Sequence, residues 1–390
     1  MVTNLNVFAY LSIMIYLDNA STSFFKPRCV KKIVKTGLKK YTANASRSGH
    51  KYALIAGEKI AKVRESFANV FNCSYNKVIF TSGCTESLNL AILGSFKKGG
   101  HIIATCYEHN STLRVLERLK SSGIIDYSIV YPDEKGKIKP YFIEKEIKEN
   151  TYMIITNHIS NVTGQEQDIY QIGLIAKKHN LLFLVDGAQS AGHKLIDMKK
   201  CNISFLALAG HKGLLSLQGV GVLCVADNVA LRPIKFGGTG TFSESLIQPN
   251  DFPEGFESGT FSAINIISLG VGLEYVYKNL ILINDKILKL SEYLNEYIKN
   301  NKKIIYYSKN SYQNGVLSFN IVNKSPQEVA SILDSKYNIA VRAGFECAPI
   351  IHKHLKTDSL GGVVRVSIGY RNKLKDIKKL IKALDFLTEN

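Results

Sequence analysis

The sequence lacks the cysteine patterns that define disulfide frameworks and zinc sites. Its seven cysteines are an odd number and include no C-x-x-C pair, which argues against both kinds of structure. Most of them stand beside aliphatic residues and are predicted to be small buried hydrophobic side chains. His352 and His354 follow Cys347 closely, but two imidazoles and one thiol without a fourth ligand do not make a metal site. We therefore expect no metal.

Runs of five or six like charges are also missing, although 50 Lys and Arg outweigh 32 Asp and Glu and leave a formal net charge of +18. The lysines are spread along the chain, and Ile, Asn and Tyr are frequent too, so a compositional bias explains much of the charge. Nucleic acid is therefore not expected as a partner. The positive charge that this bias does not explain can attract an anionic cofactor and an acidic partner protein.

The start of the chain is apolar and uncharged but has no basic residues ahead of it, and it is too short to span a bilayer. We therefore expect no signal peptide, no membrane association and a cytoplasmic location. Met14 directly precedes IYLDNAS, a sensible start for a strand. Residues 1–13 are interpreted as an over-long gene start or a loose arm.

Short apolar runs alternate with helical patterns from about residue 77 to residue 225, and we find no internal repeat. The predicted strands are Val78–Thr81, His101–Thr105, Tyr127–Val130, Tyr152–Thr156, Leu181–Val185, Phe205–Leu208 and Gly221–Val225. Amphipathic helices such as Asn110–Lys120 and Ile169–His179 separate most of them. Such alternation is typical of an α/β protein with a mainly parallel seven-stranded sheet that is covered by helices on both faces.

The remainder of the chain has a different pattern. A Gly-rich span from Lys235 to Gly259 is predicted to be a long functional loop. Beyond it we expect helices, then strands and a closing helix: Ala263–Tyr277, Asn284–Ile298, Gly315–Ile321, Ala340–Arg342 and Val363–Ile368. The predicted organisation is a large domain over residues 15–258 and a smaller C-terminal α+β domain over 259–390, with residues near 1–30 packing on the latter.

The most informative residues are Asp186 and Lys212, each of which follows an apolar strand. An apolar run that stops at an Asp is typical of a buried parallel strand whose carboxyl end delivers a charge into a crevice. A pyridoxal 5'-phosphate (PLP) enzyme needs this pair. The lysine holds the aldehyde as a Schiff base, and the aspartate keeps the pyridine nitrogen protonated. Taken singly, the Asp could be a helix cap and the Lys a solvated loop residue.

A second strand end carries TSGCTES, a strand, glycine turn and helix start. Backbone amides at Gly83, Cys84 and Thr85, with the Thr85 hydroxyl, would cradle a phosphate at the helix N-terminus. A simple Thr-capped helix explains the same pattern.

Three further polar residues follow predicted strands: His109, Asn161 and Gln189. The imidazole could stack on the cofactor ring and pass protons, although a histidine that only caps a helix is the commoner case. The two amides could hydrogen-bond the ring hydroxyl or the substrate carboxylate. All these strand ends point to the same edge of the sheet, and that convergence carries the inference.

The ordered motifs TSGCTESLN, EHN, SNVTG, VDGAQSAGH, GHKG, FESGT, RAGFECAP and RVSIGY extend from residue 81 to residue 370. Together they resemble the cysteine desulfurase and selenocysteine lyase group of class V aminotransferase-type enzymes. The resemblance implies the fold type I architecture of PLP-dependent transferases and a homodimer with active sites at the subunit interface.

The resemblance also implies roles for individual residues. Lys212 would bind PLP covalently, Asp186 would pair with the pyridinium, and His109 would stack on the ring. His211 and Thr85 would contact the phosphate, together with Thr260 from the neighbouring subunit. The implied substrate-binding residues are Ala20, His50, Asn161, Arg342 and Arg365. For Arg365, a bidentate guanidinium suits a carboxylate, but an ordinary ion pair at a strand end is also common.

Cys347 matches the sulfur-accepting cysteine of the family, and a thiolate on a mobile loop is a natural acceptor. Without the resemblance it would be taken as a buried structural cysteine. Glu346 stands directly before it, where histidine is frequent. A carboxylate beside the thiol would lower the nucleophilic fraction of that thiol, so turnover would depend on a partner that takes sulfur promptly. Ala209 and Cys84 replace residues that often donate hydroxyl hydrogen bonds to the phosphate.

The sequence therefore predicts a PLP-dependent cysteine desulfurase. It would convert L-cysteine to L-alanine and leave a persulfide on Cys347, for delivery to an acceptor protein in iron–sulfur cluster or thio-cofactor assembly. A selenocysteine lyase, an aminotransferase or a kynureninase-like hydrolase on the same scaffold is the first alternative. The second is a basic partner-binding scaffold with a vestigial PLP site.

Overall fold

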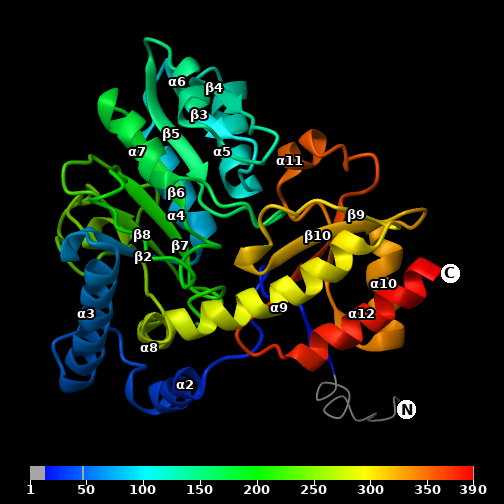
Figure 1. Cartoon of the computed structure of the whole chain (residues 1–390). Helices are drawn as coiled ribbons and strands as arrows, with labels where there is room; N and C mark the ends of the chain where they lie inside the picture. Colours follow the sequence, from blue (N-terminus) through cyan, green and yellow to red (C-terminus); the bar gives the residue numbers. More distant parts are fainter. Residues whose placement is uncertain (1–13, 46–47, 390) are drawn as a thin grey trace, which may run out of the picture. The chain divides into compact units, whose positions relative to one another are not determined.

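The computed structural model describes residues 14–45 and 48–389, which form two compact units (Figure 1). The larger unit contains residues 25–159 and 167–280. The smaller unit contains the described residues up to Phe24, residues 160–166 and the chain from Ile281 onward. Residues 1–13, which were interpreted from the sequence as an over-long gene start or a loose arm, lie outside the described part of the chain.

The larger unit is built on a seven-stranded sheet with the order β2-β8-β7-β6-β5-β3-β4. Its strands are β2 (Val78–Thr81), β3 (Gly100–Thr105), β4 (Ile125–Val130), β5 (Thr151–Asn157), β6 (Leu182–Asp186), β7 (Phe205–Ala209) and β8 (Gly221–Val225). Strand β8 runs opposite to the other six strands of this sheet. The predicted mainly parallel sheet is confirmed, and the predicted strands lie within one or two residues of the observed ones.

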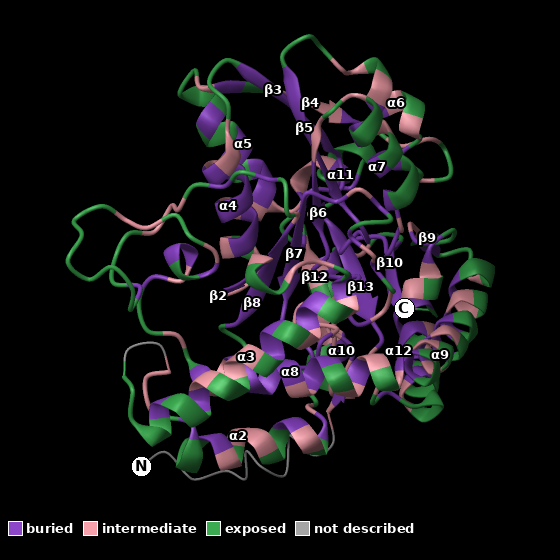
Figure 2. Ribbon diagram, turned by 90° about the vertical axis from the view of Figure 1, so that its left-hand side faces the viewer, coloured by how far each residue is buried: buried purple, intermediate pink, exposed green. Residues whose placement is uncertain are grey.

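The helices of this unit bury apolar residues against the sheet or against one another. They are α2 (Arg28–Lys40), α3 (Lys51–Phe71), α4 (Cys84–Ser95), α5 (Asn110–Ser121), α6 (Pro140–Lys145), α7 (Ile169–Lys178) and α8 (Ala263–Lys278), with the short 3₁₀ helices Tyr75–Lys77 and Glu254–Phe256. Leu88 of α4 and Leu116 of α5 are fully buried in one cluster with strand residues such as Ile102. In Figure 2 most of this sheet is purple, although β4 at its edge also has intermediate and exposed residues, and the helices carry exposed green turns.

Helix α8 belongs to the larger unit, although the predicted boundary at residue 258 assigns it to the C-terminal domain. The reason is its packing. Ala263 and Ile267 are buried together with Tyr41 and Ala56, and a Cβ at Gly37 of α2 would lie 3.2 Å from the Ile264 side chain. The apolar pattern of α8 predicts a helix but does not reveal which partner buries it.

The smaller unit contains an antiparallel sheet with the order β12-β13-β10-β9 and a parallel pair, β1-β11. The strands are β1 (Ile15–Tyr16), β9 (Ile304–Tyr306), β10 (Val316–Ile321), β11 (Ile339–Ala340), β12 (Arg342–Gly344) and β13 (Val363–Ser367). The helices are α9 (Leu280–Asn300), the 3₁₀ helix Tyr312–Asn314, α10 (Pro326–Tyr337), α11 (Pro349–His354) and α12 (Leu374–Glu389).

One predicted strand of this unit, Ala340–Arg342, is wrong as a single element. Residues 339–340 pair with β1, whereas residues 342–344 pair with β13. The chain changes its partner between them, and an extended sequence pattern contains no information about such a change.

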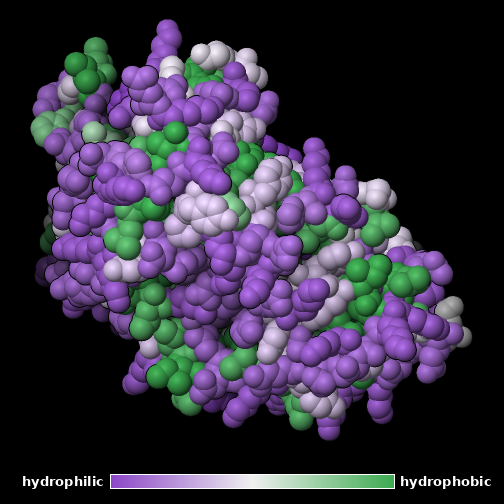
Figure 3. All heavy atoms as spheres, turned by 45° about the horizontal axis from the view of Figure 1, so that its top comes forward, coloured by the Kyte–Doolittle hydropathy of each residue, from purple (hydrophilic) through white to green (hydrophobic). Residues whose placement is uncertain are grey.

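The face shown in Figure 3 is mainly hydrophilic, with apolar side chains in separate patches. Within the described ranges, no single helix has the length and apolar character needed to cross a membrane. The bent pair of α8 and α9 meets that test of length and composition only when the two helices are taken together.

Candidate active site

The carboxyl ends of six strands lie along one edge of the larger unit's sheet, and β4 is among them because it is parallel to β3. Strands β3, β5, β6 and β7 are parallel, and β2 points the same way because β2 and β7 are both antiparallel to β8. The residues that follow these ends include Gly83, His109, Asp186 and Lys212. The sheet thus gathers the predicted cofactor-binding segments of this unit at one edge, where ligands bind in open α/β sheets.

Asp186 is the last residue of β6 and is only 2% exposed. Its Oδ1 accepts hydrogen bonds from the Ala188 backbone N–H (2.9 Å) and from the Cys84 thiol (3.5 Å). It pairs in register with Ala207 of β7, the strand that leads to Lys212. Gln189 follows within one turn and is also buried. The acid is therefore held rigidly beside the strand that delivers the lysine.

The Cys84 thiol lies within electrostatic reach of both charges. Burial raises the pKa of this thiol well above its usual range, the negative charge of Asp186 raises it further, and the positive charge of Lys212 lowers it. Cys84 therefore stays protonated and donates to Asp186, and Lys212 lies close enough to the same thiol to affect its pKa. A PLP site needs an acid and a lysine amine in one place, and this thiol connects the two.

Gly83 opens the turn before α4 toward solvent. A Cβ at Gly83 would meet no atom within 4 Å, whereas a Cβ at Gly221 would lie 2.6 Å from the carbonyl carbon of Gly83. Strand β8 therefore supports the turn from behind and leaves its outer face open. The first N–H groups of α4, at Cys84 and Thr85, belong to a helix start and suit a phosphate. These donors fit the phosphate of PLP.

His109 caps helix α5. Its Nδ1 lies 3.1 Å from the Ser111 backbone N–H and 2.8 Å from the Ser111 hydroxyl. Because a backbone N–H can only donate, Nδ1 is the accepting nitrogen, and the neutral ring carries its proton on Nε2. The helix-capping role considered for this residue is therefore real. It also fixes the orientation and tautomer of the ring, as a stacking or proton-passing imidazole requires.

His211 is neutral at physiological pH. Burial, together with the positive charges of Lys212 and Lys26, lowers its pKa to about 4. Burial also lowers the pKa of Lys26 to about 8. Sequence reasoning missed Lys26, because a lysine before a proline at a helix start looks like an ordinary surface residue.

Glu108 is a second residue that sequence reasoning missed. It is completely buried directly before His109, and its Oε1 accepts hydrogen bonds from the Thr105 hydroxyl (2.7 Å) and the Asn157 backbone N–H (2.8 Å). Asn157 pairs in register with Asp186. The carboxyl group thus ties β3 to β5 beneath the candidate site. An acid at the end of a buried strand is the same signal that identified Asp186, so the sequence did contain it.

Replacing Glu108 by Gln should stabilise the protein at alkaline pH. Burial raises the pKa of Glu108 from 4.5 to about 8, and the charge of Asp186 contributes. The unfolded chain therefore loses this proton first, and the folded state loses stability as pH rises between those values. At pH 8 the variant should be more stable by about 4 kcal/mol, whereas at pH 4 the two proteins should be nearly equal. Urea unfolding at both pH values, with Glu149→Gln as control, measures this. A variant less stable than the wild type at pH 8 would contradict it.

The smaller unit contains its own polar cluster around Arg365, which is 2% exposed. Its Nη2 donates to Asp18 Oδ1 (2.7 Å) and to the Ser21 hydroxyl (2.8 Å), and its Nη1 donates to the Asn161 backbone carbonyl (2.9 Å). The ion pair considered as an alternative for Arg365 thus exists, but it is buried. Within residues 14–45 and 48–389, Arg365 Nε and Asn161 Oδ1 have no hydrogen-bond partner. A buried donor and acceptor without partners fit a carboxylate-bearing amino acid.

The remaining predicted substrate and sulfur residues of this unit lie near the same strand. Ala20 donates its backbone N–H to the Ser367 hydroxyl (2.9 Å). Arg342 is exposed on β12 and pairs in register with Arg365. Cys347 is exposed and lies between β12 and α11. The alternative of a buried structural cysteine is therefore wrong.

Two predicted residues of the larger unit are placed elsewhere in it. His50 caps helix α3, where its Nδ1 accepts from the Ala53 backbone N–H (3.3 Å). Thr260 is exposed and accepts a weak hydrogen bond from Asn44 (3.4 Å). An exposed Thr260 is what a contact from a neighbouring subunit would need, and that role stays a prediction.

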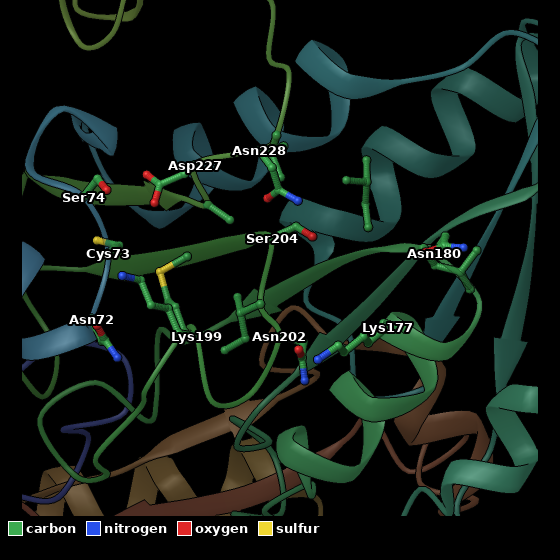
Figure 4. Close-up of a pocket in the computed structure, with 17 residues that line it drawn as sticks. Asn72, Cys73, Ser74, Lys177, Asn180, Lys199, Asn202, Ser204, Asp227 and Asn228 are labelled. Carbon is green, nitrogen blue, oxygen red and sulfur yellow. The ribbon is translucent and has the colours of Figure 1, made fainter.

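A groove with a cavity volume of about 590 Å³ lies at the opposite, amino edge of the same sheet (Figure 4). Asn72, Lys177, Lys199, Asn202 and Asp227 stand around it. None of the predicted site residues lines this groove. It supplies matched control positions for the experiments below.

The fold and the gathered acid and lysine define the class of PLP-dependent enzymes of fold type I. The sequence matches the family described as "Aminotransferase class-V" over residues 15–380, and the chain belongs to this family. The predicted family, fold type and PLP dependence are confirmed.

The most similar relatives considered are named "Probable cysteine desulfurase". The protein from Methanothermobacter thermautotrophicus is 36% identical over 378 residues, which cover 95% of this chain and 94% of that protein. The protein from Pyrococcus abyssi is 33% identical, with 97% and 95% covered.

Solved structures agree with this assignment. The apo cysteine desulfurase from Thermococcus onnurineus NA1 is 30% identical, with a TM-score of 0.89 and 100% of both chains covered. The S-sulfonic acid form of the cysteine desulfurase CsdA from Escherichia coli has a TM-score of 0.87 and 23% identity, with 97% and 96% covered. The latter likeness shows the fold alone.

Proposed function

We propose that this protein is a PLP-dependent cysteine desulfurase that uses Cys347 as the sulfur acceptor. The balanced reaction is L-cysteine plus the Cys347 thiol giving L-alanine plus a Cys347 persulfide. A protein acceptor then takes the outer sulfur for iron–sulfur or thio-cofactor assembly. The observation that carries the proposal is the buried Asp186 beside the strand that delivers Lys212, in a chain that also exposes Cys347.

The residues of the larger unit hold and tune the cofactor. Lys212 supplies the amine that binds the aldehyde of PLP, and Asp186 supplies the negative charge that keeps the pyridine nitrogen protonated. The open turn at Gly83 and the start of α4 receive the phosphate. When bound, PLP supplies an electron sink for the negative charge that forms when the bond to sulfur breaks.

The residues of the smaller unit receive the substrate and the sulfur. Arg365 offers its Nε and Nη2 edge to the substrate carboxylate, a bidentate geometry that carboxylates prefer. Since Asp18 already contacts Nη2, the substrate carboxylate must share or displace that contact. Cys347 accepts the sulfur as a thiolate, the nucleophilic form of the side chain.

Incubation with L-cysteine and a thiol reductant tests this function. We expect alanine and sulfide in equal amounts. Amino transfer that requires a keto acid would favour an aminotransferase, and turnover of selenocysteine without cysteine would favour a selenocysteine lyase. A colourless protein with salt-dependent nucleic-acid binding would instead support a non-enzymatic scaffold. The homodimer, the acceptor protein and the cytoplasmic location stay predictions.

Replacing Asp186 by Ala should weaken PLP binding and slow turnover. The variant loses the charge opposite the pyridinium, and hydrogen bonds to charged groups contribute about 1.5–3 kcal/mol. The dissociation constant of PLP should therefore rise about 10- to 100-fold. Absorbance titration with PLP and sulfide release measure both effects. Asp227→Ala, on the opposite edge of the sheet, is the control, and equal PLP affinity in the two variants would contradict the assignment.

A further inference from the structure

Cys347 lies in a turn whose backbone conformation is unfavourable for its residues. The φ angles of Glu346 and Cys347 are 45° and 60°, so two consecutive residues other than glycine occupy the left-handed region. Such conformations persist only where the surrounding structure holds them, and they concentrate at functional sites. The neighbours of Cys347 should therefore include the groups that hold it in place.

The exposed Cys347 stands between two buried residues. Glu346 is 5% exposed and Ala348 is not exposed at all. The Ala348 backbone N–H donates to the Phe345 carbonyl (2.9 Å), and the Asn161 side-chain amide donates to the Glu346 carbonyl (2.7 Å). The backbone is thus fixed on both sides of the thiol, while the thiol itself faces solvent.

The Glu346 side chain points into the protein, toward His352. Its carboxyl group is fully buried, and its Oε2 lies 3.3 Å from His352 Nε2. That nitrogen also contacts the Phe345 carbonyl (3.1 Å), and His352 Nδ1 lies 2.8 Å from the Thr357 hydroxyl. Since a carbonyl only accepts, His352 Nε2 carries a proton. The imidazole therefore contacts both the side chain of Glu346 and the backbone of the same turn.

This carboxyl group is costly to bury. Burial raises the pKa of Glu346, although its contact with His352 and the charges of Arg365 and Arg342 lower it. Its Oε2 lies at ion-pair distance from His352 Nε2, but within the described residues neither carboxyl oxygen has a hydrogen-bond partner. A poorly paired buried acid contributes little to stability by itself. Its position one residue before the exposed thiol therefore favours a role in shaping the turn that contains Cys347.

We propose that Glu346 is a positioning residue for sulfur transfer: its inward side chain, seated against His352, anchors the turn that presents the Cys347 thiol. The contact of Glu346 with His352 exists in the folded chain whatever the protein does. Its effect on sulfur transfer rests on the proposed function. Without the side chain, the backbone should relax toward ordinary φ values. The thiol would then spend less time in position to attack, which lowers the effective concentration of the nucleophile.

Hydrogen exchange of the holoenzyme tests the anchor directly. In Glu346→Ala, the backbone amides of residues 345–348 should exchange at least tenfold faster than in the wild type. Sulfide release should show a kcat about tenfold lower, with an unchanged KM for cysteine and an unchanged visible absorbance band. Glu346→Gln keeps the shape of the side chain and should stay within threefold of the wild type. Glu292→Ala, at an exposed position of α9, is the control.

Unchanged exchange in Glu346→Ala, or faster exchange with an unchanged kcat, would overturn the proposal. If Glu346→Ala does not fold, His352→Asn removes the imidazole that contacts Glu346. It should likewise give faster amide exchange and a lower kcat. The two proposals fail separately. A wild-type protein that releases no sulfide from cysteine refutes the proposed function, whereas the exchange rates still decide whether Glu346 anchors the turn.

Discussion

Replacing Lys212 by Ala should abolish turnover of L-cysteine and remove the visible absorbance band of the purified protein. The lysine amine that follows β7 is the group that would hold the PLP aldehyde covalently, so its loss removes both the attachment and the alignment with Asp186. We expect activity to fall by roughly a thousandfold or more. Absorbance spectra and sulfide release before and after addition of L-cysteine measure the two effects.

Lys199→Ala is the matched control for this variant. Lys199 is an exposed lysine at the amino edge of the same sheet, and its removal should leave both measurements unchanged. Borohydride reduction of the wild-type protein, followed by peptide mass spectrometry, should place the reduced cofactor on the peptide that contains Lys212. A Lys212→Ala protein with an unaltered spectrum would refute its role.

The sheet of the larger unit could be predicted closely because most of its strands are buried on both faces. Strand β8 contains Val222, Leu223 and Cys224 in an unbroken apolar run, and such runs are recognisable without knowledge of the fold. The strand order is not contained in these runs. Asp186 and Lys212 could nevertheless be assigned to one site, because ligands bind at the carboxyl ends of parallel strands. This rule requires that the strands are parallel and does not require the order of the strands in the sheet.

Partner choice and side-chain direction could not be predicted in the same way. The segment Ala340–Arg342 looks like one strand, but its halves pair with different strands. Asn161 was predicted both as a cofactor ligand and as a substrate-binding residue together with Arg365, and its contacts are with Arg365 and Glu346 of the smaller unit. Glu346 was expected beside the thiol, yet its rotamer and burial are set by His352, a tertiary contact.

Replacing Cys347 by Ser should keep the folded, coloured protein and eliminate persulfide formation. The serine hydroxyl has nearly the same size, and its position is exposed, so stability should change little. Oxygen cannot replace the thiolate as sulfur acceptor, so sulfide release should fall at least about a hundredfold. Alkylation after addition of cysteine, followed by mass spectrometry, should find one extra sulfur atom on the Cys347 peptide of the wild type alone.

Cys73→Ser separates this role from general thiol chemistry, because Cys73 is a partly exposed cysteine that lines the groove at the amino edge. It should release sulfide at the wild-type rate. Full sulfur release by Cys347→Ser would mean that sulfur leaves without a protein acceptor at this position. The reaction would then belong to another class of enzyme with the same fold, such as a selenocysteine lyase. The proposed roles of Lys212 and Asp186 would still hold, because they do not depend on which atom receives the sulfur.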